Sequence, residues 1–373
     1  MKLTPLKTLA ASAVLCALSS TAYAATAAKI GDTEFTYGGY IKLDSMWSDY
    51  SAGAPAGSNV GRDFYVPSTL TVGDDNSSDA VFDMDNGKTV NTKIEIDFLA
   101  SAAGGNERVS NSYAPRIRHA FVTYDGWLFG QTWSNFQNVG ALAETLDFVG
   151  PAEGTVFVRQ SQIKYTTGAW SFSLENPEST ISTTSGMVVT DDASLPDFTA
   201  RYTHKADWGN IVVAALARQL TYKVGSVDAD ETSFGISASG KINLGEDNLK
   251  FMLTQGKGLG RYVGLNVAHG AVLNGDELDA IDSTSGFVAY QHKWTSQWRS
   301  TFLYSFFSAD NNTDLLAISG DPTESSQSYS ANILYSPVKR LTFGAELKHA
   351  ERETESGVDG DLDRLQFSVK YSF

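Results

Sequence analysis

Two arginines, Arg116 and Arg118, stand one residue apart in the segment PRIRHAF (115–121), and three acids follow within residues 134–156. The acids are Glu144, Asp147 and Glu153. If the arginines lay on one wall of a narrow, water-poor passage and the acids on a loop facing them, the opposite charges would set an electric field across that passage. Such a field sorts solutes by charge and needs neither a nucleophile nor a metal.

Short segments of alternating polarity would have to position these charges. In RLQFSVKYSF, at the end of the chain, apolar residues occupy every second place and polar residues fill the places between them. Successive side chains of a β-strand point to opposite faces, so this pattern predicts a strand with one apolar and one polar face. The apolar positions are Leu365, Phe367, Val369, Tyr371 and Phe373.

The same pattern recurs along the chain and predicts sixteen antiparallel strands. Tight turns rich in Asn, Gly, Asp or Pro alternate with long, polar, acidic loops, which is typical of an outer-membrane barrel. The predicted strands are 35–49, 78–85, 89–100, 115–124, 127–133, 157–167, 169–176, 197–205, 209–220, 232–243, 247–256, 284–294, 297–308, 327–336, 339–350 and 362–373. The predicted long loops are 50–77, 101–114, 134–156, 177–196, 221–231, 257–283, 309–326 and 351–361.

Composition narrows the choice of architecture. The formal net charge of −15 argues against binding to nucleic acid. A soluble β-sandwich or propeller would also have alternating strands, but here the polar faces carry charges in mid-strand and aromatic residues gather near strand ends. The sequence therefore predicts an all-β fold, a sixteen-stranded antiparallel transmembrane β-barrel with an inward-folded constriction loop at about 134–156.

The first 24 residues have the pattern of a secretory signal peptide. A short basic region precedes an apolar core over residues 9–18, and Ala22-Tyr23-Ala24 fits the small-x-small cleavage pattern. We expect cleavage after Ala24, which removes the single cysteine, Cys16. Residues 25–373 contain no recognisable linker, so we expect one porin-like barrel domain.

The phase of each strand decides which charges face the lumen. In residues 115–121, Ile117 and Phe121 are placed towards lipid. That choice turns the alternate residues inwards, namely Arg116, Arg118 and Ala120. The same reasoning gives more inward cations than inward acids, so the predicted lumen is basic. The predicted basic wall of the constriction comprises Arg116, Arg118, Arg159, Lys93, Arg201 and Arg299.

Arg159 is the ambiguous member of this wall. Strict alternation from Ile163 and Tyr165 points its side chain at lipid, which costs roughly 2–4 kcal/mol at mid-depth. A bulge, or a place at the mouth of the strand, would turn the guanidinium inwards instead. Both orientations stay open on the pattern alone.

Two longer stretches resemble a known family. These stretches are similar to the fourth to sixth strands and the constriction loop of a sixteen-stranded trimeric porin. They are APRIRHAFVTYDGWLFGQTWSNF (114–136) and ETLDFVGPAEGTVFVRQSQIKYTTG (144–168). With FYVPSTL, IEIDF, PDFTARY and SPVKRLTFGAE, they make the chain resemble the DcaP-type porins of Gram-negative bacteria. The resemblance implies a homotrimer, a loop folded into the pore, an inward Arg159, and passive uptake of small, often anionic, solutes.

The leading hypothesis is an outer-membrane diffusion porin that favours small anionic or carboxylated solutes. The alternatives are a barrel enzyme of the phospholipase or protease type and a structural or adhesive barrel. No Ser–His pair or metal-binding cluster is recognisable by spacing, so we expect no enzymatic activity, cofactor or metal. The expected partners are two further copies, the lipid bilayer, lipopolysaccharide, the barrel-assembly machinery and small solutes. The face formed by Phe367, Val369, Tyr371 and Phe373 resembles a membrane-insertion signal.

Overall fold

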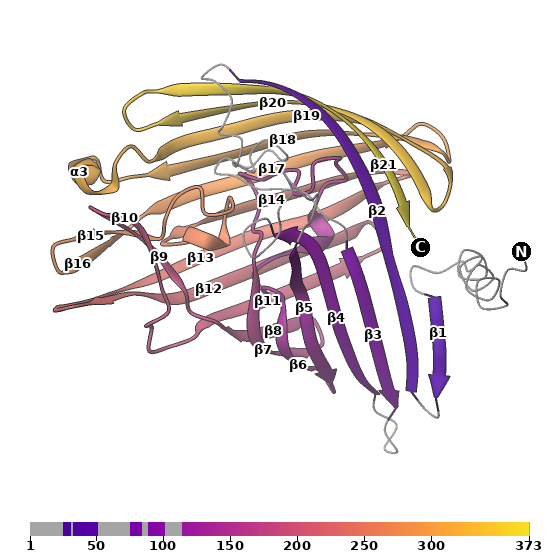
Figure 1. The fold of residues 1–373 in the computed structure, drawn as a ribbon, viewed down its shortest axis with the longest axis horizontal. Coiled ribbons are helices and arrows are strands. Elements are labelled where there is room, and N and C mark those ends of the chain that lie inside the picture. Colours follow the sequence, from indigo (N-terminus) through magenta and orange to yellow (C-terminus); the bar gives the residue numbers. More distant parts are fainter. Residues whose placement is uncertain (1–24, 31–32, 51–74, 84–88, 101–113, 373) are drawn as a thin grey trace, which may run out of the picture.

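The computed structural model describes residues 25–30, 33–50, 75–83, 89–100 and 114–372, with side chains described over 91–97 and 115–372. This part of the chain is mainly β-structure (Figure 1). The signal peptide, residues 51–74 of the loop predicted at 50–77, residues 101–113 of the loop predicted at 101–114, and Phe373 lie outside it. The strands of the large sheet are β1 (Ala25–Ile30), β2 (Thr33–Tyr50), β3 (Asp75–Asp83), β4 (Thr89–Ala100), β5 (Ala114–Tyr124), β6 (Trp127–Trp133), β7 (Arg159–Thr167), β8 (Trp170–Glu175), β11 (Asp197–Ala206), β12 (Gly209–Val224), β13 (Val227–Leu244), β14 (Asp247–Lys257), β17 (Asp282–Lys293), β18 (Trp298–Asp310), β19 (Thr323–Val338), β20 (Leu341–Thr354) and β21 (Asp359–Ser372).

Neighbouring strands of this 17-stranded sheet pair antiparallel. β21 pairs with β2 from Tyr40↔Ser372 to Tyr50↔Leu362, and β2 also pairs with β3. In Figure 1 the indigo β2 accordingly lies beside the yellow β21. The first and last thirds of the chain therefore meet along one seam, and β1 adds to β2 beyond the point where β21 ends.

The structure contains more strands than the sixteen predicted. A second sheet of four strands has the order β10-β9-β15-β16. Its strands are β9 (Ser179–Thr183), β10 (Gly186–Thr190), β15 (Ala271–Asn274) and β16 (Glu277–Ala280). They fall within the predicted loops 177–196 and 257–283, where short strands in polar sequence give no clear alternation.

The predicted loop 221–231 is also wrong, because β12 and β13 continue to a turn between Val224 and Val227. Short helical turns complete the described structure. They are three 3₁₀ turns, η2 (Val139–Ala141), η3 (Gly260–Tyr262) and η4 (Thr313–Leu315), and the single-turn helix α3 (Leu316–Ser319). None of the described helices has the length and apolarity needed to cross a bilayer.

The two faces of the large sheet have opposite chemistry. On β20, Leu347 is 62% exposed, whereas the neighbouring Glu346 and Lys348 are buried. Globular proteins soluble in water usually show the reverse, with apolar groups buried and charged groups exposed. This inversion indicates that the exposed face meets an apolar medium and that the polar face lines the interior.

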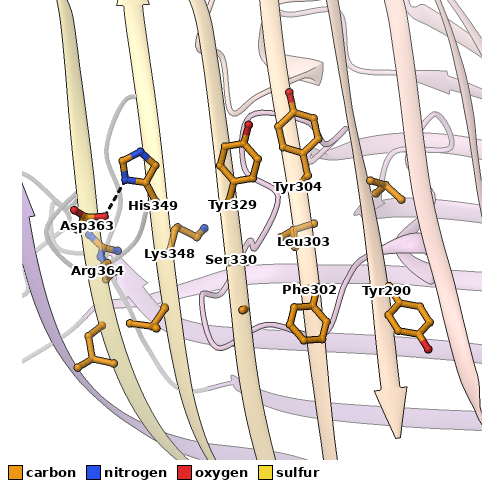
Figure 2. Close-up of a pocket in the computed structure, with 14 residues that line it drawn as sticks. Tyr290, Phe302, Leu303, Tyr304, Tyr329, Ser330, Lys348, His349, Asp363 and Arg364 are labelled. Carbon is orange, nitrogen blue, oxygen red and sulfur yellow. Dashed lines mark hydrogen bonds and ion pairs between the residues drawn. The ribbon is translucent and has the colours of Figure 1, made fainter.

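The outer face carries a depression of about 790 Å³ across β17 to β21. Figure 2 shows the rings of Tyr290, Phe302, Tyr304 and Tyr329 on neighbouring strands beside the His349–Asp363 contact. Phe302 and Tyr329 are each about half exposed. Aromatic side chains of this kind are typical of the girdles of a membrane-facing surface, so the depression belongs to the outer face of the sheet and not to its polar inner face.

The seam can be tested with the double variant Asp44→Cys/Ser368→Cys. These residues are partners in the β2–β21 pairing, and directly paired residues have Cα atoms about 4.5–5.5 Å apart, within disulfide range. We expect a disulfide to form in the membrane-inserted protein, seen as a reductant-sensitive mobility shift. Asp44→Cys/Ser330→Cys is the control, since Ser330 lies on β19. A failure of the first pair to cross-link would contradict the seam.

Candidate functional site

The segment between β6 and β7, residues 134–158, lies against the inner, polar face of the large sheet. Asn138 Nδ2 donates a hydrogen bond to Ser239 Oγ of β13 over 3.0 Å. Further along, the Gly154 amide donates to Ser305 Oγ of β18 over 3.1 Å. We call residues 134–158 the constriction loop, because they cross the inward faces of strands that are far apart in the sequence.

Two cationic side chains of the large sheet hydrogen-bond to the backbone of this loop. Arg201 Nη1 of β11 donates to the Gln137 carbonyl over 2.8 Å, and Lys250 Nζ of β14 donates to the Leu142 carbonyl over 2.6 Å. Carbonyl oxygens that are removed from water need such donors. Arg201 therefore anchors the loop, and it lies apart from the arginines of β5 with which it was grouped on sequence.

Glu144 forms the clearest ion pair of the loop. Its carboxylate accepts from Arg299 Nη2 at 2.5 Å and from Arg299 Nε at 2.7 Å, a bidentate arrangement. Gln291 Nε2 adds a third hydrogen bond at 2.6 Å. Burial favours the neutral acid, but these donors prevail and hold the pKa of Glu144 below its ordinary value. Glu144 is therefore ionised at neutral pH and neutralises Arg299.

Asp147 meets β20. Lys348 Nζ lies 3.2 Å from Asp147 Oδ2 and donates to the Gly150 carbonyl over 2.9 Å. Glu346, two residues earlier on the same strand, accepts from the amides of Leu146 at 2.8 Å and Asp147 at 3.2 Å. All three ionisable side chains are buried. Charges removed from water in this way persist only when they are paired and hydrogen-bonded.

Glu153 is fully buried at the far end of the loop. The side chains that act on its carboxyl group are those of Lys348, Ser328 and Asp147. Burial is the largest influence and raises the pKa of Glu153 above its ordinary value, despite the opposing charge of Lys348. The loop thus contains two acids in ion pairs, Glu144 and Asp147, and one buried acid, Glu153, whose pKa is raised.

The prediction that these three acids face Arg116, Arg118 and Arg159 is wrong. Glu144 and Asp147 instead pair with cations of β18 and β20. The physical reason is that the buried Lys348 and the half-buried Arg299 need counter-charges, and the loop acids supply them. The sequence pattern gives the inward direction of a side chain but not the wall that a long loop will follow.

Arg116 and Arg118 belong to a separate group of charges on β4, β5 and β7, which we call the basic cluster. Arg116 is bidentate to Asp97, with contacts of 2.9 and 2.6 Å. Arg118 Nε lies 2.8 Å from Glu95, and its Nη1 lies 3.5 Å from Asp97. Lys93 shares Glu95 at 2.9 Å. The cluster comprises Lys93, Glu95, Asp97, Arg116, Arg118 and Arg159, that is, four cations and two acids.

Arg159 turns towards this cluster. Its guanidinium lies over the ring of Trp133, 4.8 Å from the centroid, and that of Arg118 lies 6.0 Å from the same ring. Trp133 also packs edge-on against Phe157 of the constriction loop. None of the ion pairs found among the described residues includes Arg159. Its charge is thus balanced by an aromatic face rather than by an acid.

A bulge in the β4–β5 pairing changes the phase expected for β5. The register shifts between Glu95↔His119 and Ile96↔Ile117. Arg118 and His119 are both buried, and beyond them the 39% exposed Val122 faces outwards. The expectation that Ala120 faces the lumen and Phe121 faces lipid is therefore wrong. A bulge adds one residue to one strand, so the alternation reverses after it.

The residues of the expected insertion signal lie on the outer face of β21. Phe367 is 52% exposed and Val369 is 39% exposed, while Tyr371 is half-buried. Phe373 lies outside the described residues. All three described side chains alternate with inward polar residues, as the pattern indicated.

The sequence reasoning missed a second buried group of charges. This group lies on the inner face of the large sheet and comprises Glu175, Asp197, Arg218, Arg261 and Tyr262. Arg261 and Tyr262 lie in the predicted long loop 257–283, for which the pattern gave no inward direction. The available signal was the glycine-rich run GKGLG before them, which indicates close approach of backbone to other groups.

Comparisons with known proteins agree with this geometry. The model of the family described as DcaP outer membrane protein matches residues 68–373. The chain belongs to the DcaP outer membrane protein family. It is therefore a protein of the Gram-negative outer membrane, in the class of porins and channels. None of the curated proteins matches the chain.

Solved structures of similar fold include outer-membrane channels and porins. The outer membrane channel DcaP of Acinetobacter baumannii has a TM-score of 0.79 at 24% identity, covering 94% of this chain and 100% of that one. A trimer form of OmpT from Vibrio cholerae has a TM-score of 0.58 at 12% identity, covering 91% and 99%. An anion-selective porin from Comamonas acidovorans has a TM-score of 0.55 at 11% identity, covering 92% and 100%.

The raised pKa of Glu153 predicts a pH-dependent loop. Because docking of the loop raises the pKa of Glu153, protonation of Glu153 stabilises the docked loop. This contribution is fully present below the ordinary pKa of the acid and is lost as the pH rises through the raised pKa. We expect open-channel current noise to increase from pH 5 to pH 8 in the wild type. The Glu153→Gln variant, which is neutral at every pH, should show little change, and exposed Glu324→Gln should behave like the wild type. Equal pH dependence in Glu153→Gln would contradict this assignment.

Proposed function

We propose that the chain forms a water-filled channel for passive diffusion of small hydrophilic solutes, with a preference for anions, including carboxylated ones. The observation that carries this proposal is the basic cluster, in which four cations stand against two acids. The constriction loop adds to the imbalance, because Glu144 and Asp147 are paired with Arg299 and Lys348. The acids of the loop are therefore not available to cancel the positive charge of the cluster.

The position of these charges matters more than the net charge of the chain. Acids such as Glu351, Glu353 and Asp359 are exposed near the ends of β20 and β21. Exposed charges are screened over a Debye length of about 8 Å at physiological salt. Charges that line a narrow passage act at contact distance in a lower dielectric. The basic cluster thus dominates the sign of selectivity.

The proposal also covers closure of the barrel, its oligomeric state and its insertion into the membrane. The pairings of β2 with β3 and β21 support a closed barrel of sixteen strands, with β1 added at the seam. Structural similarity to a trimer form of OmpT supports a homotrimer. The outward face formed by Phe367, Val369, Tyr371 and Phe373 would be the signal by which the assembly machinery recognises the chain.

An enzymatic barrel is less well supported. Ser182 Oγ lies 2.7 Å from His269 Nδ1, the kind of contact that a serine nucleophile would need. However, Ser182 is only 6% exposed, and no carboxylate in the described part of the chain hydrogen-bonds to His269. A buried serine whose base lacks an orienting acid does not form a working triad.

The sign of selectivity tests the proposal. In a salt gradient across a planar bilayer, the wild type should give a reversal potential on the anion-selective side. The Arg116→Glu/Arg118→Glu variant should lose or reverse it, because the cluster then has two cations and four acids. Lys339→Glu/Arg340→Glu, at the short turn between β19 and β20, makes the same change of charge outside the cluster and serves as the control.

Two results would contradict the proposal. A cation-selective wild type would show that the basic cluster does not set the sign. A reversal potential that moves as far in the turn control as in the cluster variant would show that net charge alone decides.

A further inference from the structure

A second segment, residues 258–270 between β14 and β15, also folds inwards. Tyr262 is fully buried and Val263 is 2% exposed, although this run was assigned to an external loop on sequence. Gly258 allows the entry, since its φ is +65° and an added Cβ would lie 2.1 Å from Ser233 Oγ. We call residues 258–270 the second loop.

The second loop is paired with the constriction loop. Val156 and Val263 form an antiparallel bridge. The Phe157 amide donates to the Tyr262 carbonyl over 3.1 Å, and the Gly264 amide donates to the Thr155 carbonyl over 3.1 Å. The constriction loop is therefore held between the barrel wall on one side and the second loop on the other.

Apolar packing extends the same contact. Leu265, whose φ of +56° is unusual for a residue with a branched side chain, packs against a cluster that includes Val149 and Ala152 of the constriction loop. The cluster continues to Ala350 of β20 and Leu362 of β21. A backbone conformation of this kind persists only when surrounding contacts hold it, so the position of the second loop depends on its docking.

Tyr262 connects the second loop to the wall. Its hydroxyl donates to Asp197 Oδ2 over 2.9 Å, with Glu175 Oε2 at 3.3 Å. The guanidinium groups of Arg218 and Arg261 lie 5.1 and 5.8 Å from its ring centroid. Burial raises the pKa of Tyr262 well above its ordinary value, so the phenol keeps its proton and remains a donor to the two acids.

We propose that residues 258–270 form a second constriction element and that Tyr262 is the positioning residue that docks it. The narrowest part of the channel is then set by two loops that support each other. This inference rests on the proposed channel function and adds to it the element that, with the constriction loop, limits the size of the solute. Tyr262 acts through the loop and makes no contact with the solute itself.

The test begins with Tyr262→Phe, which keeps the ring and removes the hydroxyl. Asp197 and Glu175 then lose a buried donor, and the second loop should leave its docked position for part of the time. We expect single-channel conductance to rise roughly 1.5-fold, as a wider passage allows, with increased open-channel noise. Tyr329→Phe, which alters an outward-facing ring, is the matched control and should match the wild type.

A disulfide separates docking from general damage to the fold. Val156→Cys/Val263→Cys places cysteines at the bridged positions, where the spacing suits a disulfide. When this pair is added to Tyr262→Phe, the oxidised protein should return to wild-type conductance and noise, and a reductant should abolish the rescue. If Tyr262→Phe merely destabilised the barrel, forming or reducing this disulfide would not switch the conductance between its wild-type value and its raised value.

Three results would overturn the inference while leaving the channel function intact. In the first, Tyr262→Phe has wild-type conductance and noise. In the second, the cysteine pair forms no disulfide. In the third, the disulfide forms but restores neither conductance nor noise. If the correctly folded wild type shows no conductance at all, it is instead the proposed channel function that fails.

Discussion

The pairing of the constriction loop with β18 and β20 is the interaction on which the rest of the interior depends. Lys348 is buried and Arg299 is half-buried, and a cation removed from water in this way needs a counter-charge. Asp147 and Glu144 supply it, while Glu346 holds the loop amides. The loop is thus fixed to one wall, and its own acids are neutralised. In the proposed channel, the charge presented to a passing solute would then come from the basic cluster on β4, β5 and β7.

If the proposed function is correct, this arrangement explains how an acidic chain would present a basic passage. The acids outnumber the basic residues in the sequence, but many of them are exposed near strand ends. In the basic cluster, each acid is shared by two cations, and Arg159 rests on Trp133 without an acid partner. An aromatic face can stabilise a cation without cancelling its charge, so Arg159 keeps its field. Local geometry, and not overall composition, sets the sign of that field.

Alternation along the strands predicted much of this from sequence, because the period of two is imposed by the backbone. It gave the strands from β4 to β8 within a few residues and the inward direction of Arg116 and Arg118. It failed at the bulge in β5, since one added residue leaves no compositional mark and reverses every face beyond it. It also could not give the partners of Glu144 and Asp147, which are set by contacts between residues more than 150 positions apart.

The second loop and the four-stranded sheet could not be predicted either, because both depend on contacts between residues far apart in the sequence. The short strands of that sheet also lie in polar sequence that shows no alternation of apolar and polar residues.

Hydrogen exchange at the amides of Leu146, Asp147 and Gly154 is the most direct test of the central claim, that the constriction loop is docked on the inner wall. We predict that in the membrane-inserted protein these amides exchange as slowly as those of β20, and that Glu346→Gln accelerates exchange at Leu146 and Asp147. Exchange as fast as that of an exposed turn in the wild type would contradict it.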